Sequence, residues 1–312
     1  MLSRIAESLY WVGRYVERAE GTARILDVHV MRILVDAGVD EHDACRTLLD
    51  AMGQVPPPGP LDAAAVLHVL AWDEAGPCSI VASLRTARDN ARGIREVLSS
   101  EMWECLNATY HTLADHVQEG AEGPHRFFSW VKERTAIVAG LADSTMTRDE
   151  AWRFLVLGRS LERVDMTARL LWTCFGSPFG SADWVTTLRS CSAQEAFLRS
   201  YRRSPSAALV AEFLLLDRLF PRSALSALVQ AEHCLAELAP QAGRAELADE
   251  ARRVLGRART ELEFARVADL LGDLPSHLRT IQAACSQAGA AVAARYFSRA
   301  QAGWRLEPAV RL

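Results

Sequence analysis

The segment GRYVERAEGTAR, residues 13–24, has a near copy in GRSLERVDMTAR, residues 158–169. Both fit the frame Gly-Arg-x-x-Glu-Arg-x-acid-x-Thr-Ala-Arg, and the copies lie 145 residues apart. Such a match over twelve positions is improbable by chance. It predicts an internal duplication, with two pseudo-repeat halves at about residues 1–143 and 144–312 of a single domain.

Each copy lies within an apolar stripe of helical period, because hydrophobic residues recur every three or four positions. In the first copy the stripe comprises Ile5, Leu9, Val12, Val16, Ala19, Ala23, Leu26, Val30 and Ile33. In the second copy it comprises Phe154, Leu157, Leu161, Val164, Ala168 and Leu171. The spacing predicts two long, related helices.

The charged residues of the motif share the opposite face of each helix, because residues three and four apart are neighbours. Tyr10, Trp11 and Tyr15 lie on or beside this face, so it is apolar enough to be partly enclosed. Three interpretations stay open: an ion-pair network joining two helices, an anion site, or a solvated charged face. The candidate residues are Arg14, Glu17, Arg18, Arg159, Glu162 and Arg163.

A second charged pattern lies in a helix predicted over residues 79–98, where four arginines recur every three or four positions. This arginine stripe comprises Arg85, Arg88, Arg92 and Arg95. Like charges at this spacing repel, so an anionic group should face them. One explanation is carboxylates from the motif helices; the candidates are Glu17, Glu20, Glu162 and Asp165. The other is a bound phosphate or carboxylate, in a pocket shared by the stripe and both motif helices.

The rest of the chain predicts further helices and no convincing strand, so the fold should be an all-α bundle of long helices. The predicted helices cover residues 41–53, 61–72, 100–116, 127–142, 183–202, 243–271 and 275–300. Pro221 fits the first position of another helix. Arg222 would then oppose the helix dipole, which predicts a carboxylate or ligand partner for it.

Composition limits the function classes. The formal net charge of −4 argues against general nucleic-acid binding, which needs a basic surface. Seven widely spaced cysteines without a CxxC pair are typical of reduced thiols. No signal core and no run of 18 apolar residues occurs, so we expect a cytoplasmic protein with no membrane contact.

Standard catalytic motifs are absent from the sequence. It contains no phosphate loop, no GxGxxG after a strand, no HExxH and no GxSxG. The eight histidines lack the spacing of metal ligands, so we expect neither a metal nor a cofactor. Glu17 and Glu162 remain as candidates for acid–base catalysis.

The chain resembles the bacterial alpha-E domain proteins, an all-helical family named for its recurrent Glu-Arg motif. The resemblance covers residues 1 to about 300. Besides residues 1–20, it rests on Ala87–Arg92, Glu101–Glu104, Thr145–Glu150 and Phe220–Ser223. Asp89 and the pair Val164-Asp165 are mild departures from the family pattern.

The resemblance implies an association with a circularly permuted ATP-grasp protein, and often with a transglutaminase-like protein. The implied role lies in an ATP-dependent amidoligase system that makes or modifies a peptide. Three hypotheses follow. The first is a helical partner that binds the ligase, an acidic peptide or a phosphate-bearing ligand. The second is an enzyme with a Glu acid or base in an arginine-lined pocket. The third is a structural helical dimer, hence a homo-oligomer, whose Glu-Arg ion pairs only hold helices together.

Overall fold

The computed structural model describes residues 1–35, 40–175, 184–239 and 249–297. The regular secondary structure of these ranges is entirely helical, without a strand, which confirms the predicted all-α class. None of their helices is both long and apolar enough for a bilayer span.

The larger helices are α1 (Ser3–Val35), α4 (Ile80–Arg92), α5 (Ser100–Glu122), α6 (Pro124–Thr145), α7 (Glu150–Phe175), α11 (Ala224–Leu238), α12 (Glu250–Phe264) and α14 (Leu274–Val292). The shorter ones are α2 (Glu41–Ala51), α3 (Ala63–Leu67), α8 (Trp184–Ser190), α9 (Gln194–Tyr201), α10 (Ala207–Leu216), α13 (Val267–Gly272) and the π-helical turns η1 (His68–Trp72) and η2 (Ala293–Phe297).

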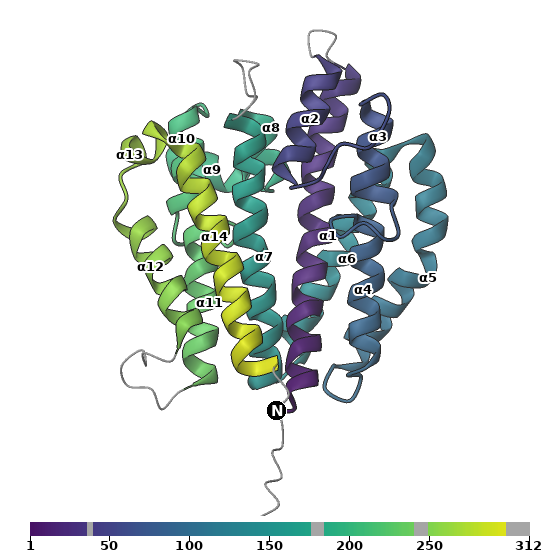
Figure 1. The fold of residues 1–312 in the computed structure, drawn as a ribbon, viewed down its shortest axis with the longest axis vertical. Helices are drawn as coiled ribbons and strands as arrows, with labels where there is room; N and C mark the ends of the chain where they lie inside the picture. Colours follow the sequence, from purple (N-terminus) through teal and green to yellow (C-terminus); the bar gives the residue numbers. More distant parts are fainter. Residues whose placement is uncertain (36–39, 176–183, 240–248, 298–312) are drawn as a thin grey trace, which may run out of the picture.

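Helices α1 and α7, which carry the two motifs, form the centre of the molecule (Figure 1). Tyr10 contacts Gly158, and Gly21 contacts Met166 further along both helices. Because the contacts advance in the same direction on both, the two helices run parallel. Most of α7 is buried, which explains why it is apolar nearly all round.

Each central helix belongs to a group of four. Helix α1 packs against α4 and α6, and α5 packs against both of these. Helix α7 packs likewise against α11 and α14, and α12 packs against both. Figure 1 shows the two groups on either side of the α1–α7 pair. The shared origin of the halves stays a prediction, but their helices meet in the same order.

The loops before α4 and α11 are fixed by the same capping chemistry. Ser79 and Ser223 are the N-cap residues, and each side-chain oxygen accepts from the backbone N–H three residues on. Pro221 therefore precedes the cap, and its predicted place at the first helical position is wrong. These capped loops bring backbone oxygens to the motif arginines.

Three predicted helices were too long. The helix predicted over 79–98 ends at Arg92, and turns follow. The helix predicted over 183–202 is two helices, divided near Ser192, whose φ of 50° is left-handed. The one predicted over 243–271 is divided at Ala265, which is extended, and its first residues lie outside the described ranges. Apolar periodicity continues across such breaks, so it does not reveal them.

Two motif glycines allow the backbones of α1 and α7 to touch. A β-carbon at Gly13 would lie 2.1 Å from the backbone oxygen of Leu155. A β-carbon at Gly158 would lie 2.0 Å from the backbone oxygen of Tyr10. Both distances are far below van der Waals contact with atoms that cannot rotate away. Any larger residue must push the two central helices apart.

Gly158→Ala should therefore destabilise the protein, by about 3 kcal/mol or more, because overpacked cores lose roughly this much. Gly140→Ala is the matched control, since Gly140 is an exposed helical glycine with no atom near its missing β-carbon. That control should gain up to about 1 kcal/mol from helix propensity. Urea denaturation measures both; equal stability of the two variants would contradict the close contact.

Candidate functional site

The Glu162 carboxylate of α7 accepts hydrogen bonds from two arginines of α1. Its Oε2 accepts from Arg14 Nε at 2.5 Å, and its Oε1 accepts from Arg18 Nε at 2.6 Å. Arg18 Nη2 adds a bond to Oε2 at 3.2 Å. The carboxylate is only 1% exposed, so these bonds replace its hydration. Of the three interpretations left open by the sequence, the ion-pair network joining two helices is confirmed here.

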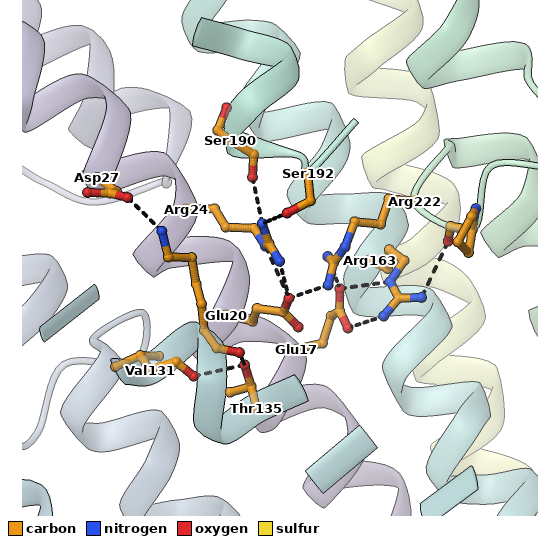
Figure 2. Close-up of polar contacts among 12 residues, drawn as sticks. Glu17, Glu20, Arg24, Asp27, Val131, Thr135, Arg163, Ser190, Ser192 and Arg222 are labelled. Atoms are coloured by element: carbon orange, nitrogen blue, oxygen red, sulfur yellow. Dashed lines mark hydrogen bonds and ion pairs between the residues drawn. The ribbon is translucent and has the colours of Figure 1, made fainter. Parts of the chain in front are cut away.

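Glu17 of α1 is bound in the opposite direction, by arginines that come from α7 and from the loop before α11 (Figure 2). Arg163 of α7 donates to its two oxygens at 2.8 and 2.6 Å, and Arg222 donates at 3.1 Å. Arg222 also pairs with Glu20, which accepts from Arg24 one turn along α1 at 2.6 Å. Arg222, for which the sequence predicted a carboxylate or ligand partner, therefore has two carboxylate partners, Glu17 and Glu20.

Both central glutamates are held in the ionised form. Burial alone would raise the pKa of the Glu17 carboxyl, but Arg163 and Arg222 outweigh it and lower that pKa from 4.5 to about 2. Burial opposes ionisation of Glu162 as well, and Arg14 and Arg18 likewise bring its pKa below the ordinary value. A general acid or base works best with a pKa near the working pH. This geometry therefore disfavours the acid–base role considered for Glu17 and Glu162.

The arginines that cross between the helices are anchored at their far ends in matching ways. Arg18 Nη1 donates to the backbone oxygen of Pro77 at 3.1 Å, and Arg163 Nη1 donates to that of Pro221 at 3.3 Å. Each proline lies two residues before the serine cap of α4 or α11. Cys78 and Arg222 therefore occupy corresponding positions, one after each proline.

The last arginine of each motif is also matched. Arg24 pairs with Glu20 and donates to the backbone oxygen of Ser190 at 3.0 Å. Arg169 pairs with Asp165 at 2.7 Å and donates to the backbone oxygen of Ala51 at 2.8 Å. Both motif ends thus tie a neighbouring short helix, α8 or α2, to the central pair.

A cavity of about 700 Å³ opens beside the Arg14–Glu162 side of this network. We call it the arginine cavity. Helices α1, α7 and α14 form its walls, and the end of α2 forms part of its rim. Its lining residues are Tyr10, Trp11, Arg14, Arg18, Asp50, Ala51, Gly53, Asp165, Arg169, Gln282, Ala283, Cys285, Ser286, Gly289, Ala290, Ala293 and Phe297. Its volume lies in the range of small-molecule sites.

Two guanidinium groups of the arginine cavity keep a donor nitrogen without a hydrogen bond to any described residue. Arg14 uses Nε for Glu162 and Nη1 for the Tyr10 hydroxyl at 3.0 Å, which leaves Nη2. Arg169 uses Nε and Nη1 as described, which also leaves Nη2. Gly289 makes room here, since its β-carbon would lie 3.1 Å from the Tyr10 hydroxyl. These nitrogens can bind an anionic group.

The corresponding space on the Glu17 side is nearly closed. It has a volume of about 30 Å³ and is lined by Arg24, Arg163 and Arg222 among others. Met166 fills it against Gly21, whose β-carbon would lie 2.8 Å from the methionine Cε. Of these two sides of the network, as the described residues form them, the Arg14 side offers room for a ligand.

The arginine stripe does not belong to this site, which corrects the predicted shared pocket. Arg85 pairs with Glu74, while Arg88 donates to the Asn107 amide oxygen at 3.1 Å and lies over the Tyr110 ring. Arg95 lies over the Trp103 ring, and Arg92 is exposed. Glu17, Glu20, Glu162 and Asp165 are paired elsewhere, so the predicted carboxylate partners were wrong. The stripe faces α5 and solvent because the apolar side of α4 packs on α1.

Arg159 also takes no part in the ion pairs between the two motif helices. It donates to Asp143 at 3.2 Å, although its charge still helps to lower the pKa of Glu17. The sequence prediction missed Arg169, Asp165 and Gln282 as lining residues. The first two stand inside the motif, whose twofold pattern marked them; Gln282 on α14 carries no comparable signal. No metal-binding group of three or more His, Cys, Asp or Glu occurs in the described ranges.

Comparison with known proteins supplies a family match. Residues 1–297 match the Alpha-E family, described as a predicted alpha-helical domain with a conserved ER motif. An uncharacterized protein of Mycobacterium bovis is 28% identical over 319 aligned residues, as are uncharacterized proteins of two Mycobacterium tuberculosis strains. The alignment covers 89% of this chain but 36% of each relative, so the chain spans about a third of their length. No solved structure matches.

Glu17→Gln should destabilise the protein by about 3–5 kcal/mol at pH 7, because Arg163 and Arg222 lose a buried partner. The folded-state pKa of Glu17 is lowered, so its stabilising effect is full above pH 4.5 and is lost as pH falls toward 2. The difference between wild type and variant should shrink over that window. Denaturation curves from pH 7 to 2 measure it. Glu74→Gln, in an exposed pair, should show no such trend.

Proposed function

The chain belongs to the Alpha-E family, and on that premise we propose that it is a helical partner of an ATP-grasp amidoligase system. In this role it binds a ligand of the system by an anionic group, a carboxylate or a phosphate, in the arginine cavity. The partner is a circularly permuted ATP-grasp protein, and a transglutaminase-like protein is a further candidate. The chain itself supplies binding, and the ligase supplies the ATP-dependent chemistry.

Two observations support an accessory role. The family resemblance connects such chains with ATP-grasp proteins, either as neighbours or as fused parts. The curated relatives are about three times as long as the aligned segment, so in them this helical unit is joined to additional sequence. An all-α unit that works beside another protein suits both arrangements.

The arginine cavity carries the ligand part of the proposal. Nη2 of Arg14 and Nη2 of Arg169 have no hydrogen-bond partner within the described ranges, and both side chains are rigidly held by an internal carboxylate. Preorganised guanidinium groups bind carboxylate and phosphate oxygens well, because little side-chain freedom is lost on binding. Both arginines are mostly enclosed, with 13% and 22% of their side chains exposed.

The two alternative functions fit less well. An enzyme that used Glu17 or Glu162 as acid or base would need a carboxyl that titrates near neutral pH, and both are held ionised. A structural dimer whose Glu-Arg pairs only hold helices accounts for the central pairs between α1 and α7. It gives no role to the arginine cavity.

Co-expression of the chain with a circularly permuted ATP-grasp protein from the same organism should yield a complex that survives affinity purification and gel filtration. Arg169→Gln should keep the complex but lower ligase turnover, because the arginine cavity loses a ligand donor. Arg92→Gln is the matched control: Arg92 is an exposed arginine outside the cavity, and its variant should leave turnover unchanged. Failure to isolate any complex would refute the partnership.

A further inference from the structure

We infer that the ligand of the arginine cavity is zwitterionic: an α-amino acid or short peptide with a free amino group and a free carboxylate. The carboxylate is bound by Nη2 of Arg14 and Arg169, and the ammonium group by Asp165. This inference rests on the proposed function and names the class of ligand. It follows from comparing the open cavity with its closed counterpart on the Glu17 side.

The closed side shows what the acidic residue of the motif normally binds. Glu20 accepts from two guanidinium groups, those of Arg24 and Arg222. Asp165 takes the place of Glu20 in the second motif, but among the described residues it pairs with one guanidinium, that of Arg169. Its other oxygen accepts from the amide of Gln282 at 3.3 Å, a neutral donor at long range. Asp165 thus lacks one cationic partner.

The missing cation has a structural cause. Cys78 stands where the other half has Arg222, and its short side chain does not bridge the neighbouring carboxylates. A thiol cannot carry a positive charge, and burial, which raises the pKa of Cys78, keeps it neutral. The arginine cavity opens beside Asp165 and Arg169. An ammonium group of a ligand in the cavity can therefore supply the charge that Arg222 supplies on the closed side.

The charges around the cavity favour a ligand with no net charge. Three guanidinium groups line or border it, and three carboxylates balance them: Asp50 and Asp165 in the lining and Glu162 behind Arg14 and Arg18. A phosphate dianion would leave negative charge uncompensated in a partly enclosed site. A zwitterion keeps the balance and satisfies both the free guanidinium nitrogens and the under-bonded Asp165.

The remaining walls suit a peptide-sized molecule. Tyr10, Trp11 and Phe297 provide aromatic surface on one side. Along α14, Gly289 and other small residues leave space instead of filling it. A dipeptide with an apolar side chain fits a volume of about 700 Å³, with its charged ends directed to the arginines and Asp165.

Isothermal titration of the full chain tests the inference with three probes: L-alanyl-L-phenylalanine, its N-acetyl derivative and its C-terminal amide. The free dipeptide should bind, and each blocked derivative should bind about tenfold more weakly or worse, because each loses a charged hydrogen bond. Inorganic phosphate and succinate serve as simple anions. They should bind more weakly than the free dipeptide.

Two variants locate the interaction. Asp165→Asn should remove the preference for the free over the acetylated dipeptide while the C-terminal amide stays weak. Ser286→Phe places a bulky group on the exposed α14 wall of the cavity without changing any charge, and it should abolish binding. Arg92→Gln should bind like wild type. Thermal melts of each variant verify folding, and Ser286→Phe retains the test if Asp165→Asn unfolds.

The outcomes separate this inference from the proposed function. Equal binding of free and acetylated dipeptide overturns the zwitterion and leaves an anion site. Tight phosphate binding with no dipeptide binding also overturns it and favours a phosphate-bearing ligand. If no probe binds, both the zwitterion and the ligand part of the proposed function are overturned, while the ligase complex is judged by its own purification.

Discussion

The backbone contact between α1 and α7 is the constraint on which the rest of the structure depends. Gly13 and Gly158 bring each helix against a backbone oxygen of the other, and no side chain fits between them. At that separation the glutamates that follow, Glu17 and Glu162, are enclosed by the opposite helix. Enclosed carboxylates require cationic partners, and the partners nearest in space are the arginines of the facing motif. Each copy of the Gly-Arg-x-x-Glu-Arg motif thus supplies one side of the same interface between α1 and α7.

The ion pairs between α1 and α7 determine the alignment of the two helices more than the strength of their association. Two charges removed from water gain little over a well-packed apolar pair, whereas a buried charge without its partner costs several kcal/mol. Sliding one helix by a turn would leave Glu17 and Glu162 facing the wrong residues. The parallel alignment is therefore specified by the penalty on every other alignment, and the capped loops at Pro77 and Pro221 are held to the same arginines.

The sequence was sufficient to predict the features that follow from regular spacing. It was not sufficient for those that depend on single irregular positions or on tertiary packing. Helical period and the doubled motif predicted an all-α fold and an ion-pair network between the motif helices, because both depend on local spacing. The arginine stripe was misplaced because periodicity shows which residues share a face of α4, but not which helix meets that face. The cavity needed Gln282 and Gly289 of α14, which reach the site only through tertiary packing. Likewise, Ser192 divides a predicted helix through one left-handed residue.

The two sides of the central pair show how one framework gives both a sealed joint and a binding site. On one side Arg222 and Met166 occupy the space next to the motif, so the carboxylates and arginines there satisfy one another. On the other side Cys78, whose side chain is short, corresponds to Arg222, and the space beside the motif stays open. The framework charges are almost the same in both places. What distinguishes the binding side is thus the replacement of one long cation by a short neutral side chain, which leaves polar groups preorganised by an interface that the fold needs in any case.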